Sequence, residues 1–183
     1  MPALLHRLQQ DHRQLHVLLN LLERSLDRFH QGIEPNYEVL AEALEYLESY
    51  ADQVHHPSEE VLFRYLRDRL QGEVPQLEVL MRQHEVLSEL TGNFRQILEG
   101  IIHEEVLRRD VVEAQGRELV EVLRKHLQQE ETTLFPLAQI QLSEGDWQEL
   151  EAQLAQKIGP LVDAQDLARF QTLYQRLLVQ LQP

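Results

Sequence analysis

Apolar residues, mostly leucines, recur at intervals of three and four along most of this chain of 183 residues. In the first segment the apolar positions are Leu4, Leu5, Leu8, Leu15, Leu18, Leu19, Leu22 and Leu26. Such spacing places side chains on one face of a helix, whereas a half-buried strand alternates apolar and polar residues. No segment shows a convincing alternation of that kind, and the sequence therefore predicts an all-α protein.

Prolines, glycines and capping residues divide this pattern into six helices. Asn36 is a predicted N-cap, and Asp110 with Glu113 resembles a capping box. Pro57 lies inside the second helix and predicts a kink there, because proline cannot donate its amide and clashes with the preceding turn. The predicted helices are Pro2–Phe29, Tyr37–Leu70, Pro75–Glu99, Asp110–Phe135, Glu144–Ile158 and Ala164–Leu181.

Four long helices joined by short connections are typical of an up-down-up-down bundle. We therefore predict that residues 1–142 form a four-helix bundle. The two additional short helices fall in residues 143–183 and carry apolar positions, such as Leu150 and Phe170, that need cover. We expect this C-terminal extension to pack on the bundle, where it could cap the bundle or form the surface of a homodimer.

Composition and charge exclude several kinds of protein. The chain has no cysteine, which excludes disulfides, iron–sulfur clusters and cysteine nucleophiles. Its formal net charge of −14 repels phosphate backbones, so we expect no nucleic-acid partner. No apolar run is long enough to span a membrane, and we expect a soluble, cytoplasmic protein. No glycine-rich phosphate loop or nucleophile triad indicates an enzyme class, which leaves enzymatic activity open.

Two matched segments carry the chemistry of the chain. Each contains His-x-x-x-Glu-Glu, followed within four residues by Leu-Phe. One segment begins at His55 and the other at His126. Residues four apart on a helix share a face, so His55 with Glu59, and His126 with Glu130, direct an imidazole and a carboxylate at one point. Each segment therefore offers two ligands to a metal ion.

The register of the helices predicts that these ligands meet. His12 and His55 lie at nearly equal distances from the first interhelical turn, and His84 and His126 from the third. Where antiparallel helices are neighbours, a difference of one or two residues in these distances shifts the heights of the ligands by only ~1.5–3 Å, because an α-helix rises ~1.5 Å per residue. A single helical histidine is usually solvated or packed in a core, but four buried histidines and two carboxylates would be costly without metal.

The ligand set favours particular metals. Nitrogen and oxygen ligands without sulfur suit iron or manganese, although zinc or copper could occupy the same imidazoles. Six protein ligands are too many for one ion that must also bind a substrate, but they suit two ions bridged by carboxylates, with Glu59 and Glu130 as the bridges. Ferritin-like proteins use Glu-x-x-His instead, and none of His55, His84 and His126 has glutamate three residues before it.

With these motifs, the chain resembles the hemerythrin-like, HHE cation-binding family over about Leu4–Leu142. The resemblance rests on Asp11-His12-Arg13-Gln14-Leu15, on the two matched segments and on Gln83-His84-Glu85. It implies a bundle with a non-haem centre of two iron ions, and makes manganese or zinc less expected occupants. The ligands that the resemblance implies are His12, His55, Glu59, His84, His126 and Glu130.

The third helix departs from the family pattern. Oxygen-carrying hemerythrins resemble this chain but place two histidines one turn apart on that helix. In this chain the residues one turn before and one turn after His84 are Leu80 and Ser88, so a second histidine is missing. One ion would then keep an open or water-filled position, unless His16 supplies the missing ligand. On a helical wheel, three neighbours of the ligands point about 100° away and are expected beside the ligands or at the surface: His56, Glu60 and Glu131. We expect exposed positions for His6, His30 and His103.

The resemblance implies a function in handling small molecules or iron. Under this interpretation the protein binds or reacts with dioxygen, nitric oxide or peroxide, or it senses or handles iron itself. The alternative is a structural or interaction bundle whose metal site has decayed or holds zinc.

Overall fold

A computed structural model describes residues 2–71, 74–157 and 164–180, with side chains from 168 to 179 in the last segment. All regular elements in these ranges are helices, which confirms the all-α prediction. The ends predicted at Ile158 and Leu181 lie outside the described residues. The elements are α1 (Ala3–His30), α2 (Tyr37–Tyr46), the π-helical η1 (Leu47–His55), α3 (His56–Leu70), α4 (Pro75–Ile102), α5 (Arg109–Gln129), the π-helical η2 (Glu130–Leu134), α6 (Phe135–Gln141), α7 (Glu144–Lys157) and α8 (Ala164–Gln180).

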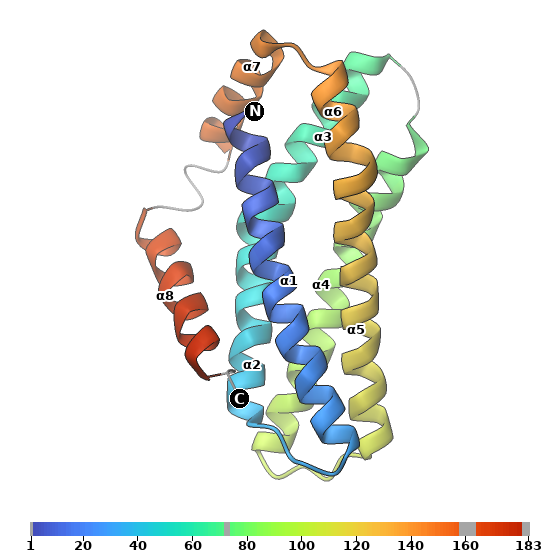
Figure 1. Ribbon diagram of the computed structural model, residues 1–183, viewed down its shortest axis with the longest axis vertical. Helices are drawn as coiled ribbons and strands as arrows, with labels where there is room; N and C mark the ends of the chain where they lie inside the picture. The colour runs from blue at the N-terminus through green and yellow to red at the C-terminus, as the bar shows by residue number, and fades with distance from the viewer. Residues whose placement is uncertain (1, 72–73, 158–163, 181–183) are drawn as a thin grey trace.

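The long helices lie side by side along the length of the molecule (Figure 1). The main contacts join α2 to α4, and α5 to both α1 and α4. Helix α7 packs on α3 and α8 packs on α2, so the C-terminal helices contact the outside of the long ones. No helix in the described part of the chain combines the length and apolar character needed to span a membrane.

Aromatic side chains and ion pairs join α8 to α2 and η1. The Phe170 ring lies 5.4 Å from Tyr50 and 6.3 Å from Tyr46, measured between ring centroids. At the rim, Arg176 donates to Glu42 over 2.7 Å. The apolar face of α8, which the sequence analysis expects to need cover, is thus buried against α2 and η1.

The structure confirms one predicted helix cap and differs from the prediction at two other helix ends. The Asn36 side chain accepts a hydrogen bond from the Val39 amide (3.2 Å), as expected of an N-cap. The capping box at Asp110 is wrong: α5 begins at Arg109 without a side-chain cap, because Asp110 pairs with Arg108 and leaves the backbone amides alone. Helix α4 also continues past the predicted end at Glu99 to Ile102.

Both matched segments run through π-helical backbone. The distortion predicted at Pro57 takes the form of η1, which ends two residues before that proline, and η2 likewise ends two residues before Pro136. A π-helical turn holds one residue more than an α-helical turn and is common at functional sites. The candidate ligands His55 and Glu130 lie within η1 and η2.

The core depends on a close approach at Gly116 of α5. A Cβ atom there would lie 2.7 Å from both Leu26 Cδ2 and Phe94 Cζ, and these two side chains are themselves buried. Only a residue without a side chain lets α1 and α4 approach α5 this closely.

We expect Gly116→Ala to lower the free energy of unfolding by about 1–3 kcal/mol, the usual effect of an overpacked core. Gly92→Ala is the matched control, because its Cβ would meet only Glu48 Oε1 at 3.6 Å. That substitution should be neutral or stabilising by about 0.4–1 kcal/mol, since it restricts the unfolded chain. Urea unfolding of both variants measures the difference, and equal stabilities would contradict the close approach.

Candidate metal centre

The six candidate ligands lie together in the interior of the bundle. None is more than 5 % exposed, and they come from α1, η1, α3, α4, α5 and η2. Each of the four long segments therefore brings at least one candidate ligand to the same buried cluster. The residues are His12, His55, Glu59, His84, His126 and Glu130.

Glu59 approaches imidazoles on two sides. Its Oε1 atom lies 3.3 Å from Nε2 of both His12 and His55. Its Oε2 atom lies 3.5 Å from Nε2 of His84, which comes from a different helix. A carboxylate placed in this way can give one oxygen to each of two cations.

Glu130 occupies the corresponding position on the opposite segment. Its Oε2 atom lies 3.3 Å from His126 Nε2 and 3.5 Å from His12 Nε2. Its Oε1 atom lies 3.7 Å from His84 Nε2. Potential ligand atoms lie within 4.8 Å of one another in His12–His55–Glu59 and also in Glu59–His84–His126–Glu130. Glu59 belongs to both groups, so the geometry suits a pair of ions that share ligands.

Several polar atoms at this centre are buried without hydrogen-bond partners among the described residues. An unsatisfied buried polar group costs about 1–3 kcal/mol, and more when it is charged. Lone pairs of imidazoles and carboxylates that converge without donors are what a bound cation satisfies. The atoms are His55 Nε2, Glu59 Oε2, both ring nitrogens of His84, His126 Nε2 and both carboxylate oxygens of Glu130.

In three of the imidazoles, an oxygen acceptor lies beside Nδ1, the ring nitrogen that points away from the other candidate ligands. His55 Nδ1 lies 3.3 Å from Asp11 Oδ2, and the other oxygen of Asp11 accepts a 2.8 Å hydrogen bond from Tyr50. Such an acceptor keeps the proton on Nδ1 and leaves the Nε2 lone pair free for a metal. The same arrangement orients two further rings, with His12 Nδ1 3.1 Å from Glu131 Oε1 and His126 Nδ1 2.9 Å from Gln83 Oε1.

The family of the chain follows from a comparison with known domains. The Hemerythrin HHE cation binding domain matches residues 3–138, a range that includes all six candidate ligands. The chain belongs to this family. A second match covers residues 77–181 and overlaps the first. No curated protein and no solved structure matches the chain.

The phenylalanines of the two matched segments shield the metal centre from water. Phe135 lies 5.1 Å from the His12 ring, and Phe63 lies 6.2 Å from the His84 ring, between centroids. Both phenylalanines are almost fully buried. These rings exclude water from the imidazoles, which strengthens the electrostatic interactions among the ligands.

The neighbours of the ligands occupy different environments in this HHE protein. Glu131 lies beside His12, as predicted, and Glu60 pairs with Arg64 at the surface over 2.7 Å. His56 is buried and stacks on His84, so the expectation that it lies beside the ligands is met. His16 does not join the buried cluster; its side chain is 32 % exposed and lies 3.8 Å from Glu131. The exposed positions predicted for three other histidines are confirmed for His6, His30 and His103.

Regular helical spacing does not predict which residues orient the imidazoles, although Asp11 and Gln83 belong to the motifs that carry the family resemblance. Asp11 directly precedes His12, and Gln83 directly precedes His84, yet each supports a histidine of another segment. Asp52, four residues before His56, contacts that ring through Nδ1 at 3.2 Å. The spacing of one helical turn between Asp52 and His56 is a signal from which this last contact could have been predicted.

Without metal, the histidines divide into two classes. Burial lowers the pKa of His12, but Glu59 and the neighbouring carboxylates outweigh burial and raise the pKa to about 8. Burial lowers the pKa of His84 as well, but the nearby carboxylates of Glu130 and Glu59 outweigh it and raise the pKa to about 9. Burial dominates at His126 and holds its pKa well below the usual value. The centre therefore retains protons at neutral pH that a cation must displace.

The two carboxylates also differ. Burial opposes ionisation of Glu59, but His55 and the other imidazoles hold its pKa well below the usual value. Burial and the charge of Glu59 raise the pKa of Glu130 to about 7. The like charges of the two carboxylates thus favour a proton on Glu130, and a shared cation would remove that repulsion.

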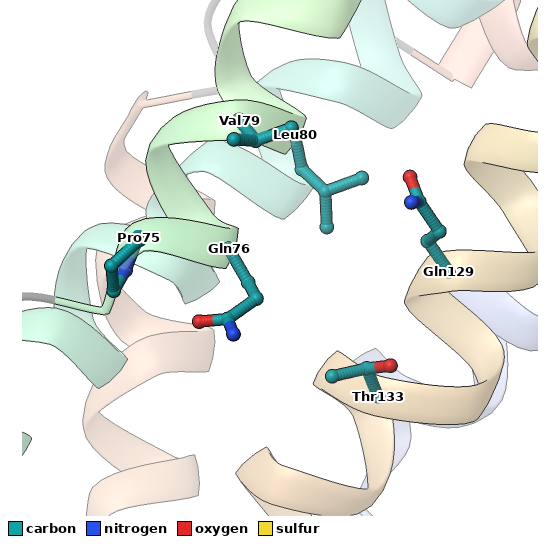
Figure 2. A pocket seen from close by; sticks show the side chains of 6 residues that line it. All are labelled: Pro75, Gln76, Val79, Leu80, Gln129 and Thr133. Carbon is teal, nitrogen blue, oxygen red and sulfur yellow. The ribbon is translucent and has the colours of Figure 1, made fainter.

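A pocket of about 280 Å³ lies beside this centre, between α4 and the α5–η2 segment (Figure 2). Leu80, one turn before His84, points into it from α4. Gln129 lines the opposite side and accepts a hydrogen bond from Gln83, which holds His126. The pocket is large enough for a diatomic molecule and adjoins residues that contact the candidate ligands.

We expect His12→Ala to lower the metal content of the protein, whereas His16→Ala should leave it unchanged. His12 is fully buried among the carboxylates, and His16 is partly exposed one turn away. Elemental analysis after anaerobic loading with ferrous iron and desalting measures both variants. Equal iron contents would show that His12 is not a ligand.

Proposed function

We propose that this HHE protein holds two iron ions bridged by Glu59 and Glu130 within an up-down-up-down four-helix bundle. At this centre it binds or reacts with a small ligand such as dioxygen, nitric oxide or peroxide. In the assignment we favour, His12 and His55 bind one ion, and His84 and His126 bind the other. Manganese and zinc could use the same ligands but are less favoured.

The observation that carries this proposal is the position of Glu59. Its two oxygens approach imidazoles of different groups, at 3.3 Å from His12 and His55 and at 3.5 Å from His84. One ion would leave some of these converging ligands unused, whereas two ions use both carboxylate oxygens. The negative charges of Glu59 and Glu130 would also partly offset the charge of two ferrous ions.

Iron supplies redox chemistry with oxygen and nitrogen oxides that no side chain offers. The protein contributes position and environment. Asp11, Glu131 and Gln83 fix the orientation of three imidazoles, and Phe63 and Phe135 keep bulk water from the rings. The pocket beside Leu80 is the route we propose for a small ligand, because its size and apolar wall suit a diatomic molecule.

The proposed function is tested by loading the metal-free protein anaerobically with ferrous iron and then admitting oxygen or nitric oxide. We expect two irons per chain and a change in visible absorption that saturates in proportion to the iron pairs. Protein loaded with zinc is the control and should show no change. Iron that is retained but unreactive toward both gases, or a protein that takes up only zinc, would contradict the proposal.

A further inference from the structure

His56 lies among the candidate ligands although it is not one of the six residues that the family resemblance implies. Its side chain is only 8 % exposed, and its ring stacks on His84 with 4.1 Å between centroids and 11° between planes. The His126 ring is 6.1 Å away. One potential ligand atom from each of His56, His84 and His126 falls within 4.8 Å of the others.

The orientation of His56 matches that of three candidate ligands. Its Nδ1 lies 3.2 Å from Asp52 Oδ1, and the Ser88 hydroxyl donates a 2.7 Å hydrogen bond to the other oxygen of Asp52. Asp11, Glu131 and Gln83 act on Nδ1 of His55, His12 and His126 in the same way. Support of a ring through an outer carboxylate or amide oxygen is the usual arrangement for a metal-ligating histidine.

Ser88, which supports Asp52, lies on α4, the helix that carries one histidine where oxygen-carrying hemerythrins have two. It lies one turn after His84, at one of the two positions where a second histidine would share that face of α4. Ser88 cannot serve as an imidazole ligand, but its hydroxyl fixes Asp52, and Asp52 fixes His56. An imidazole from α3 is thereby held next to His84, although α4 itself supplies only one histidine.

We propose that His56 is a fifth histidine ligand, which binds the ion on the α4–α5 side together with His84 and His126. It takes the place of the histidine that α4 lacks, and Asp52 and Ser88 are its positioning residues. This inference rests on the metal centre of the proposed function. It assigns three imidazoles to one ion and two to the other.

Cobalt(II) provides the test, because it shifts the proton resonances of the imidazoles that bind it. We expect His56→Phe to keep an aromatic ring stacked on His84 but to lose one exchangeable, strongly shifted N–H resonance relative to the wild type. The affinity of the protein for the more weakly bound cobalt should fall about tenfold or more, since disturbing even an outer partner of a ligand typically costs 10–100-fold. His56→Ala should give the same two results.

Glu60→Ala is the matched control, because Glu60 lies on the same turn but pairs with Arg64 at the surface. It should keep every shifted resonance and the wild-type affinity. If His56→Phe also keeps all the resonances and both cobalt affinities, His56 is a packing residue and the inference is overturned. A wild-type protein that binds only one cobalt would overturn the paired centre of the proposed function instead, while the loss of a resonance in His56→Phe would still identify His56 as a ligand.

Discussion

Glu59→Ala is expected to bind fewer than two iron ions per chain. The wild-type carboxylate places one oxygen 3.3 Å from His12 and His55 and the other 3.5 Å from His84. Removing it deprives both proposed ions of a shared ligand and of a negative charge that offsets their repulsion. Iron analysis after anaerobic loading and desalting measures the loss.

The matched control for this substitution is Glu60→Ala, which removes the adjacent carboxylate without touching the centre. Glu60 pairs with Arg64 at the surface, and exposed pairs contribute about 0–1 kcal/mol. This variant should therefore retain both irons. Glu130→Ala should behave like Glu59→Ala, because Glu130 approaches His126, His12 and His84. Either bridge variant that keeps two irons with an unchanged spectrum would refute the assignment of the bridges.

Metal should stabilise the folded protein strongly, although the fold does not require it. An ion that binds the folded chain and not the unfolded one adds about 2.7 kcal/mol at a hundredfold excess over its dissociation constant. The metal-free protein should remain helical, because leucines from all the long segments pack the interior above and below the centre. Urea unfolding followed by circular dichroism, with and without ferrous iron under anaerobic conditions, measures this difference. A metal-free protein that is unfolded, or equal midpoints, would contradict the account.

The stabilisation by metal should grow as the pH rises from about 6 to 9. In the metal-free protein the pKa of His12 is raised to about 8 and that of His84 to about 9, so both rings are protonated at pH 7. Their ion pairs stabilise the metal-free fold fully below the unfolded pKa of 6.5, and this stability is lost as the pH rises through 8 and 9. Over the same range, protons compete less with the metal. Both effects widen the gap between the loaded and metal-free proteins.

The sequence predicted the helices and the candidate ligands because both depend on local spacing. Apolar residues at intervals of three and four define the helices, and His-x-x-x-Glu places two ligands on one face. Equal distances from the turns then brought His12 and His55 to one height, and His84 and His126 likewise. These inferences need only the geometry of regular α-helices, and the structure places all six residues together.

Sequence reasoning did not predict features that depend on irregular backbone or on contacts between segments. A helical wheel directs His56 about 100° away from His55, but the backbone changes from π- to α-helical between these two residues. The wheel leaves open whether His56 lies beside the ligands or at the surface, and the structure places it in the interior, stacked on His84. The interactions of Asp11 and Gln83 depend on neighbouring segments, which local spacing does not encode.

One π-helical segment did leave a trace in the sequence. The second matched segment has one more residue between Glu-Glu and Leu-Phe than the first. That additional residue falls within η2, and a π-helical turn accommodates one extra residue. The insertion lets Phe135 pack on His12 much as Phe63 packs on His84. Comparing the two segments residue by residue could have predicted this distortion.

Mössbauer spectroscopy of the iron-loaded, oxidised protein tests most directly whether two iron ions share Glu59 and Glu130 inside the bundle. The distances from both carboxylates to imidazoles on two sides predict a single spin-coupled pair that accounts for two irons per chain. Iron that occurs as magnetically isolated ions, or at one per chain, would contradict a bridged pair.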